Sequence, residues 1–369
     1  MNIKILEPSE YDDYSKFISQ NSSAQFEHSL TWAKILQDNF KHKPINFIAK
    51  DDAGIIQACI VLFECQGFFG PKNLISSPYS IFTNILANNS ESKTELIKKA
   101  IDHCKDQELG FLQIRSQHQD QIFNSVNLIE KKNVFNISLK LDSDINITWK
   151  KLPKSSIRWG IKKAEKSKIS FSKGVAPMHL DQFYNLFLST RKHRGVPAYP
   201  KKYFQDIING FGNNSSFDYQ ESSKAKDHSD VKIYITYHNE DPIAAIFLIY
   251  YNSEMRYFAA GATYNRELLS MQPYHLIMWE AIKDATEQGY KVFNLGGATT
   301  STNNGGLLTF KKRWSDTIEE IPYYYYLNNT KKIPNTEESG FIKIATKIWK
   351  ILPSPIINQI SPLIIKRFN

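Results

Sequence analysis

Cysteine is scarce in this sequence: its 369 residues include only Cys59, Cys65 and Cys104. These three form no CxxC pair and cannot all be paired within one chain, which argues against a disulfide scaffold and against a cysteine-ligated zinc site. The nine histidines stand singly, without the spacing of metal ligands. We therefore expect free thiols, as is typical of a reducing compartment, and no metal centre.

Several catalytic signatures are also missing. There is no GxxxxGK[ST] phosphate loop, no HExxH helix and no GxSxG nucleophile elbow. The first twenty residues contain acids and no apolar run typical of a secretion signal, and no window holds the roughly 18 uncharged apolar residues that a spanning helix requires. The sequence therefore predicts a cytoplasmic protein whose chemistry needs neither a metal nor a nucleophilic side chain.

Positive charge is concentrated in two windows. Lys150–Gly174 contains nine basic residues and one acid, and Phe341–Asn369 contains five basic residues and no acid. Together these windows exceed the formal net charge of +9, so the remainder of the chain is net acidic. Local basic features favour an anionic partner such as RNA, a nucleotide-linked substrate or an acidic lipid surface.

The order of hydrophobic patterns repeats along the chain. In residues 45–116, two β-rich runs joined by a polar turn precede a helical run and a short strand, and residues 231–299 repeat that order. Gly110 and Gly289 each follow the helical run, where we expect a helix C-cap. The sequence therefore predicts an α/β (α+β) fold with two copies of one unit, each a mixed sheet flanked by helices.

We divide the chain at the changes in composition. The first unit covers residues 1–149, a basic connecting helix 150–175, the second unit 176–330 and an amphipathic tail 331–369. Within the connecting helix, Arg158, Lys162 and Lys166 fall at i, i+4 and i+8 and so share one face. This stripe either contacts phosphates of RNA or a substrate, or is simply a solvated helix face.

The tail has a helical apolar face. Ile344, Ile348 and Ile351 share that face in Phe341–Asn369, and lysines lie about 120° away around the helix axis. A basic amphipathic helix that contains a tryptophan suits the inner face of an anionic membrane. The alternative interpretation is that the tail packs against the body of the protein.

The segment Gly296–Leu327 is the best candidate for a site. A strand runs into a loop rich in Gly, Thr and Asn, and the element FKKRW then presents Lys311, Lys312 and Arg313 between two aromatic residues. Loops held between strands are frequent locations of functional sites. At least one of these cations is expected to face the loop.

At this point the order of motifs resembles a known family, the Fem-type aminoacyl- and peptidyltransferases of peptidoglycan bridge synthesis, in particular their exopolysaccharide-associated relatives. The resemblance spans nearly the whole chain, and LTFKKRW is its most specific motif; it also includes FEHSLTWAKIL, LISSPYS, LQIRS, SSIRWGIKKAEKSKISF and FYNLFLSTRKHRGVPAYPKKYF. It implies two tandem acetyltransferase-like (GNAT) units and transfer of an acyl or aminoacyl group to an amine. The acceptor would be a nucleotide- or lipid-linked precursor of peptidoglycan or a surface polysaccharide.

The resemblance also implies roles for individual residues. Lys311 falls at the reaction centre, where a cation stabilises a developing oxyanion, together with Asn294, which stands where many relatives have Asp. The residues assigned to substrate binding are Lys34, Tyr79, Arg191, Arg194, Lys201, Lys202, Tyr257, Lys312 and Arg313.

The donor stays open between aminoacyl-tRNA and acyl-coenzyme A or another acyl carrier, and no tightly bound cofactor is expected. Residues 266–271 lack the glycines of the turn that usually holds the coenzyme A pyrophosphate. Two alternatives remain: a coenzyme-A-dependent N-acyltransferase acting on an amino sugar, and a non-catalytic scaffold that binds RNA or an envelope assembly. The tail suggests a peripheral contact at the inner membrane face through residues 341–369.

Overall fold

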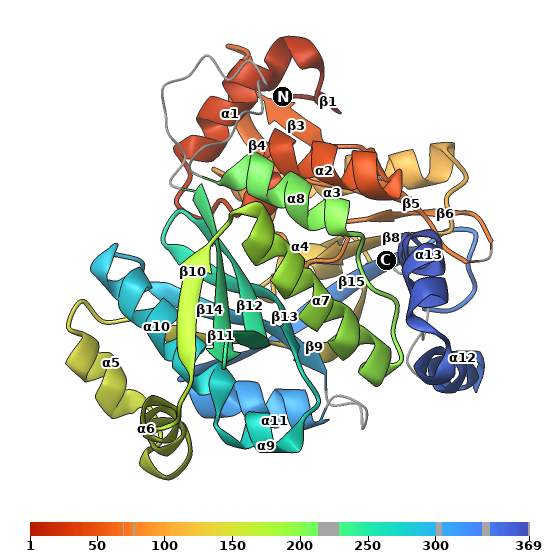
Figure 1. The fold of residues 1–369 in the computed structure, drawn as a ribbon. Coiled ribbons are helices and arrows are strands. Elements are labelled where there is room, and N and C mark those ends of the chain that lie inside the picture. Colours follow the sequence, from red (N-terminus) through yellow and green to blue (C-terminus); the bar gives the residue numbers. More distant parts are fainter. Residues whose placement is uncertain (69, 77, 213–228, 300–304, 334–339, 368–369) are drawn as a thin grey trace.

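The structure is a computed structural model that describes the chain except residues 69, 77, 213–228, 300–304, 334–339 and 368–369 (Figure 1). The N-terminal half consists of β1 (Asn2–Ile5), α1 (Tyr11–Ser19), α2 (Leu30–Phe40), β2 (Lys43–Pro44), β3 (Phe47–Lys50), β4 (Ile56–Ile60), β5 (Phe63–Gln66), β6 (Lys72–Ile75), β7 (Leu86–Ala87), α3 (Ser90–Asp106), β8 (Phe111–Arg115), α4 (Gln121–Ser125) and β9 (Ile129–Lys140).

The C-terminal half consists of α5 (Ile145–Lys151), α6 (Trp159–Lys166), β10 (Ser170–Gly174), α7 (Pro177–Arg194), α8 (Lys201–Phe211), β11 (Ser229–His238), β12 (Asp241–Tyr251), β13 (Glu254–Ala262), α9 (Arg266–Ser270), α10 (Pro273–Glu287), β14 (Val292–Thr299), α11 (Gly305–Trp314), β15 (Thr317–Leu327), α12 (Gly340–Ile351) and α13 (Ser354–Ile365). Short 3-10 turns lie at Pro8–Glu10 and Phe26–His28, and a π-helical turn lies at Lys154–Arg158.

One sheet of eleven strands runs through both halves, in the order β10-β11-β12-β13-β14-β9-β15-β8-β6-β5-β2, and a four-stranded sheet, β1-β3-β4-β7, covers the N-terminal end. The two halves exchange strands in the large sheet. β9, from the first half, pairs antiparallel with β14, and β15, from the second half, pairs antiparallel with both β9 and β8. The halves therefore share one hydrogen-bonded layer instead of meeting only through side chains.

Local sequence explains the longest hairpin. β11 and β12 pair from Ser229↔Tyr251 to His238↔Asp241, and Asn239 and Glu240 form the two-residue turn with φ of 50° and 70°. A type I′ turn needs positive φ at both central residues, and Asn tolerates this conformation well. Both strands are largely apolar because helices cover the sheet on both faces.

Separate hydrophobic cores lie on the two faces of the large sheet. One core packs α2, α7 and α8 against the sheet around Trp32, Phe183 and Phe204. The opposite core packs α6 and α10 around Ile161, Trp279 and other buried side chains. The three cysteines are buried and free, as expected, and belong to the N-terminal cores or to the core around α2.

The structure corrects two expectations and confirms a third. Residues 150–175 do not form one helix, because they contain the end of α5, the π-helical turn, α6 and then strand β10. Gly289 caps α10 with φ of 82°, as predicted. Gly110 does not cap α3: Glu108 takes the left-handed conformation, and a Cβ on Gly110 would lie 2.5 Å from Asn73 Oδ1.

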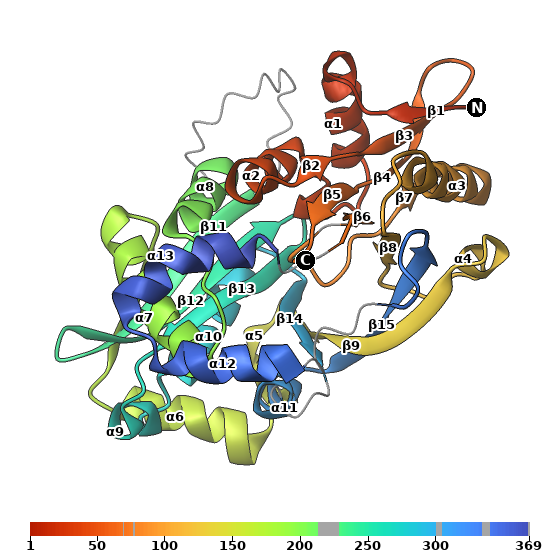
Figure 2. The ribbon, with the colours of Figure 1, turned by 90° about the vertical axis from the view of Figure 1, so that its right-hand side faces the viewer.

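The tail packs against the body of the protein on one side. α12 contacts α7, and a Cβ on Gly195 would lie 2.5 Å from the Thr346 carbonyl oxygen. Trp349 of α12 and Ile357 and Ile365 of α13 are buried, and Ile365 belongs to the core around α2, α7 and α8. Figure 2 shows α12 and α13 following one another along the outside of the molecule beside α7.

Gly261 supports the close approach of β13 to α7. A Cβ at this position would lie 2.2 Å from Phe187 N and 2.3 Å from Leu186 C, and backbone atoms of a packed helix cannot move aside cheaply. We expect Gly261→Ala to lower the free energy of unfolding by about 1–3 kcal/mol, measured by urea denaturation. Gly306→Ala is the control, since its Cβ would meet nothing within 4 Å. Equal stabilities of the two variants would contradict this account of the packing.

Candidate active site

The candidate site is a cavity of about 450 Å³ at the point where β13 and β14 part. These strands pair in parallel only from Glu254↔Val292 to Arg256↔Asn294. Beyond that point β14 stays paired with β9, and β13 stays paired with β12 past a bulge at Phe247/Leu248. The divergence leaves an opening whose walls are the following residues: Tyr257, Phe258, Ala259 and Ala260 of β13, Gly296 and Gly297 of β14, Gly306, Leu307, Phe310 and Lys311 of α11, Phe187, Thr190, Arg191 and Arg194 of α7, and Tyr79, Ser80, Ile81, Tyr199, Arg256 and Tyr274.

Lys311 is the buried cation of this cavity. Its side chain is 7% exposed, its Nζ donates to the Gly297 carbonyl oxygen at 2.8 Å, and it lies 5.8 Å from the centre of the Tyr257 ring. Burial, with a smaller contribution from the charge of Arg194, lowers the pKa of Lys311 from 10.5 to about 7. This lysine can therefore gain and lose a proton near neutral pH.

Two glycines of β14 keep the cavity open beside Lys311 and Ile81. Gly296 has φ of 78°, and a Cβ there would lie 3.4 Å from Lys311 Nζ. A Cβ on Gly297 would lie 2.9 Å from Ile81 Cγ1. Side chains at these positions would narrow the cavity next to the lysine, and the left-handed backbone at Gly296 favours glycine.

Arg191 and Arg194 add positive charge from the C-terminal turn of α7. Arg191 Nε donates to the Pro197 carbonyl oxygen at 2.7 Å, and its guanidinium lies 5.7 Å from the rings of both Phe187 and Tyr199. Burial lowers the pKa of Arg191 below its usual value. Arg191 is thus held rigidly, whereas Arg194 is exposed at the cavity wall.

Tyr79 and Tyr257 supply aromatic walls. The Tyr79 hydroxyl lies 2.9 Å from His42 Nε2 and donates to the Ile365 carbonyl oxygen at 3.2 Å, so protein partners already hold it. Burial raises the pKa of both tyrosines. Both tyrosines are therefore neutral at ordinary pH.

Asn294, predicted at the reaction centre, lies beneath the cavity. It is 1% exposed, its Nδ2 donates to Glu254 Oε2 at 3.0 Å, and its Oδ1 accepts from Gly296 N at 2.9 Å. Both ends of the amide are occupied in holding the bend at Gly296. The side chain therefore positions the backbone below Lys311 and does not face the cavity.

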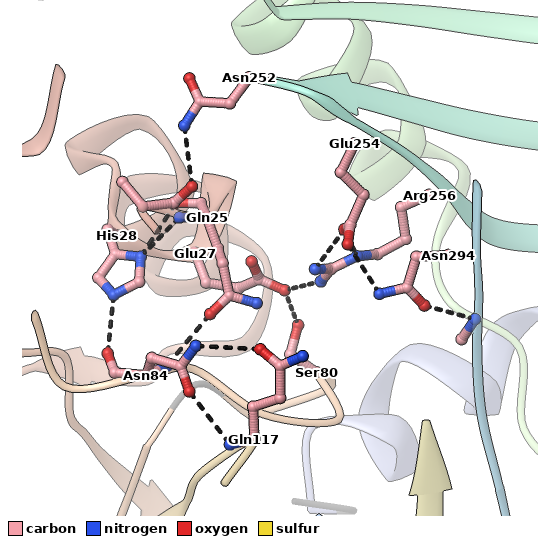
Figure 3. Close-up of polar contacts among 12 residues, drawn as sticks. Gln25, Glu27, His28, Ser80, Asn84, Gln117, Asn252, Glu254, Arg256 and Asn294 are labelled. Carbon is pink, nitrogen blue, oxygen red and sulfur yellow. Dashed lines mark hydrogen bonds and ion pairs between the residues drawn. The ribbon is translucent and has the colours of Figure 1, made fainter. Parts of the chain in front are cut away.

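A buried charge network, shown in Figure 3, supports this floor. Arg256 bonds Glu27 through Nη1 and Glu254 through Nε at 2.8 Å and Nη2 at 2.7 Å, and Glu27 accepts from Ser80 Oγ. Burial opposes the charge on Arg256, but Glu254 and Glu27 outweigh it and keep the pKa of Arg256 above its usual value. The network joins the two halves of the chain directly under the cavity.

Sequence reasoning did not identify Glu27 and Arg256 as a pair. The sequence does show that both charges lie among apolar residues. Glu27 stands in FEHSLTW, and Arg256 lies within the apolar strand pattern that contains Met255 and Phe258. A charge within a buried strand requires a partner. The sequence does not say which of the distant carboxylates supplies it.

The other predicted residues lie outside the lining of the cavity. Lys34 pairs with Asp38 at 3.1 Å, Lys201 with Asp181 and Lys202 with Asp206. Lys312 and Arg313 are exposed next to the buried Lys311, and Lys312 lies 5.8 Å from the centre of the Phe135 ring.

On α6 and the turn before it, Lys162 and Lys166 are exposed, and Arg158 lies 6.0 Å from the centre of the Trp149 ring. The stripe does not line the cavity. Any contact it makes with a phosphate would therefore be separate from the contacts made by Lys311.

Known proteins share part of the sequence pattern and the overall fold. Residues 154–312 match the family model of an acetyltransferase (GNAT) domain. The fold is similar to that of FemX, with a TM-score of 0.68 and 13% identity over 89% of this chain and 98% of that one. It is also similar to L-PGS from Bacillus licheniformis (TM-score 0.53, 11% identity, 95% and 99% covered) and to a tandem GNAT protein from the clavulanic acid biosynthesis pathway (0.54, 6%, 90% and 99%). No curated protein matches the sequence.

These similarities confirm the predicted fold, a mixed α/β fold of the tandem GNAT type over about nine-tenths of the chain. Across the part of the chain that the structure describes, no helix is both long and apolar enough to cross a membrane, and no group of three metal-binding side chains occurs.

The pKa of Lys311 makes stability depend on pH. Because the unfolded chain keeps the lysine protonated up to about pH 10 while the folded chain releases that proton near pH 7, stability rises between these values. Lys311→Met removes the titrating group and serves as the reference. We expect the difference in unfolding free energy between the native protein and this variant to increase by about 1 kcal/mol per pH unit from pH 7 to pH 10. Urea denaturation at several pH values measures this difference. A constant difference would mean that Lys311 titrates as an ordinary surface lysine.

Proposed function

We propose that this protein is a Fem-like N-acyltransferase that transfers an aminoacyl or acyl group to an amine of a nucleotide- or lipid-linked envelope precursor. The observation that carries the proposal is the burial of Lys311, with its pKa near 7, at the point where β13 and β14 diverge. The acetyltransferase domain match, which ends at residue 312, includes this lysine.

The reaction needs positioning and charge stabilisation. The acceptor's neutral amine attacks the carbonyl carbon of an activated ester or thioester, a C–N bond forms, and the carbonyl oxygen becomes an oxyanion. Collapse breaks the C–O or C–S bond, and the proton lost by the amine passes to the leaving group or to water. Lys311 in its protonated form donates to the oxyanion while Gly297 O fixes its direction.

The acceptor is anionic in this proposal. Arg191 and Arg194 of α7 place two guanidinium groups on the wall of the cavity, and Tyr257 and Phe310 contribute aromatic surface to its lining. Guanidinium groups suit phosphates, which both nucleotide-linked and lipid-linked precursors contain. Lys34, Lys201, Lys202, Lys312 and Arg313 are not needed for this binding because they lie outside the cavity.

The loop before α10 favours an aminoacyl-tRNA donor over acyl-coenzyme A. A pyrophosphate cradle needs free backbone N–H groups at a helix start. Here Asn265 Oδ1 accepts from Glu267 N and Leu268 N, the amides of Met271 and Gln272 bond to carbonyl oxygens, and the helix begins with proline. Acyl-coenzyme A remains the second candidate donor because the family model matched is that of an acetyltransferase.

Lys311→Ala should lower the rate of transfer by at least about a hundredfold, because one charged donor to an oxyanion is removed. Lys312→Ala is the matched control, since Lys312 is the exposed neighbour outside the cavity. Full activity of Lys311→Ala would refute the assignment of the reaction centre.

The pH profile of the native enzyme tests the same lysine. The rate at saturating neutral acceptor should fall as pH rises through about 7, because Lys311 then loses its proton.

The donor is tested by offering labelled aminoacyl-tRNA pools and acyl-coenzyme A in parallel and measuring binding and slow donor hydrolysis. We expect a signal with aminoacyl-tRNA that weakens steeply with added salt, because tRNA binding releases counterions. A signal with acyl-coenzyme A alone would assign the protein to coenzyme-A-dependent N-acylation. Lack of binding to either donor would leave a non-catalytic scaffold as the better description.

A further inference from the structure

The two tail helices point apolar side chains away from the body of the protein. On α12, Ile348 is 50% exposed and Ile351 is 80% exposed, and on α13, Ile356 and Leu363 are 43% and 61% exposed. Single exposed apolar residues are normal on a protein surface. A group of four on consecutive helices is typical of a surface that another phase or molecule covers.

This outward face is not needed to hold the tail in place. The inward faces of α12 and α13 already bury Trp349, Ile357 and Ile365 against the body. The two helices thus have two apolar sides, one buried against the protein and one exposed to solvent. We call the exposed side, formed by Ile348, Ile351, Ile356 and Leu363, the outer tail face.

Basic side chains accompany the outer tail face. Lys347 and Lys350 are exposed and adjacent in sequence to Ile348 and Ile351, and Lys366 and Arg367 follow α13. Residues 341–369 contain no acid. Apolar side chains next to cations, with no carboxylates, complement an anionic bilayer, where acyl chains lie below negatively charged headgroups.

A groove beside α12 has the right chemistry for a headgroup. It has a volume of about 660 Å³ and lies between α7 and the tail, lined by Ser189, Lys192, His193, Tyr264, Lys350 and Ile357 among others. The ring of His193 stacks on Tyr264 at 3.6 Å between centres. Lys350 lines this groove and precedes the exposed Ile351 in α12, so the helix that carries part of the outer tail face also contributes a cation to the groove.

The tail is also bonded to a wall of the candidate active site. The Ile365 carbonyl oxygen accepts from the Tyr79 hydroxyl at 3.2 Å, and Arg367 Nη1 donates to the Gly67 carbonyl oxygen at 3.3 Å. A surface that contacts the outer tail face is therefore held at a fixed distance from the cavity that Tyr79 lines.

We propose that α12 and α13 dock on the surface of an anionic phospholipid bilayer, with the outer tail face inserted at the headgroup boundary and the α7 groove holding a lipid phosphate. Docking uses the outer tail face and the α7 groove and does not require the transfer reaction. It places the cavity next to a membrane, where a lipid-linked acceptor would be available.

Vesicle flotation of the full-length protein tests the proposal. Vesicles of phosphatidylcholine mixed with phosphatidylglycerol should bind the protein, and vesicles of phosphatidylcholine alone should bind it far less. The variant Ile348→Ser/Ile351→Ser should weaken binding by about tenfold or more, because two side chains no longer leave water on docking. Ile55→Ser is the matched control, since Ile55 is 61% exposed in the turn between β3 and β4.

A second variant separates charge from insertion. Lys347→Glu/Lys350→Glu should remove the preference for phosphatidylglycerol, and free inorganic phosphate should compete only weakly with vesicles. Circular dichroism should be unchanged in all variants, because the substituted side chains are exposed.

The proposal is overturned if the native protein fails to float with anionic vesicles, or if the double serine variant floats as well as the Ile55→Ser control. It is also overturned if added RNA or free phosphate displaces the protein completely, since the tail would then bind a phosphate polymer or a free anion. These readouts use no substrate, so a failure of the proposed acyl transfer leaves them unaffected.

Discussion

The exchange of β9 and β15 between the halves is the constraint on which the molecule depends. Because β9 pairs with β14 and β15 pairs with β8, backbone hydrogen bonds fix the position of one half relative to the other. The cavity lies at this junction, so its walls come from both halves and still keep a defined geometry. The ion pair between Glu27 and Arg256 adds a second, side-chain link at the same place.

Negative charges lie below the floor of the cavity, and positive charges line the cavity itself. Carboxylates of Glu27 and Glu254 lie beneath the floor and neutralise Arg256, which lines the cavity together with Lys311, Arg191 and Arg194. Burying an unpaired ammonium group is unfavourable, and Lys311 responds by releasing its proton more readily. The fold thus holds a lysine that is not fixed in a salt bridge, and its protonated form can stabilise an anionic intermediate.

Periodicity and composition predicted the repeated α/β units, and the resemblance identified Lys311 and Tyr257 as well as the arginines of α7. The sequence could not reveal which basic residues face the cavity, because Lys311 and Lys312 are adjacent and only the register of α11 separates them. Nor could it reveal that Glu27 pairs with Arg256, since that contact depends on tertiary packing between distant segments. The sequence of the tail is compatible with both interpretations for a similar reason, because an amphipathic helix suits a membrane as well as a protein surface. The structure shows buried residues on one side of the tail and exposed isoleucines and a leucine on the other.

The central place of β15 also determines how the fold can be completed during synthesis. β8 and β9 leave the ribosome long before Thr317–Leu327 does, yet in the sheet they are joined only through β15, which pairs with both of them. Until β15 is added, β8 and β9 each have an unpaired strand edge. Unpaired edges can bond to strands of other chains and so lead to aggregation. Insertion of β15 must therefore be a late step, and the N-terminal half cannot reach its final sheet while the C-terminal part is still being made.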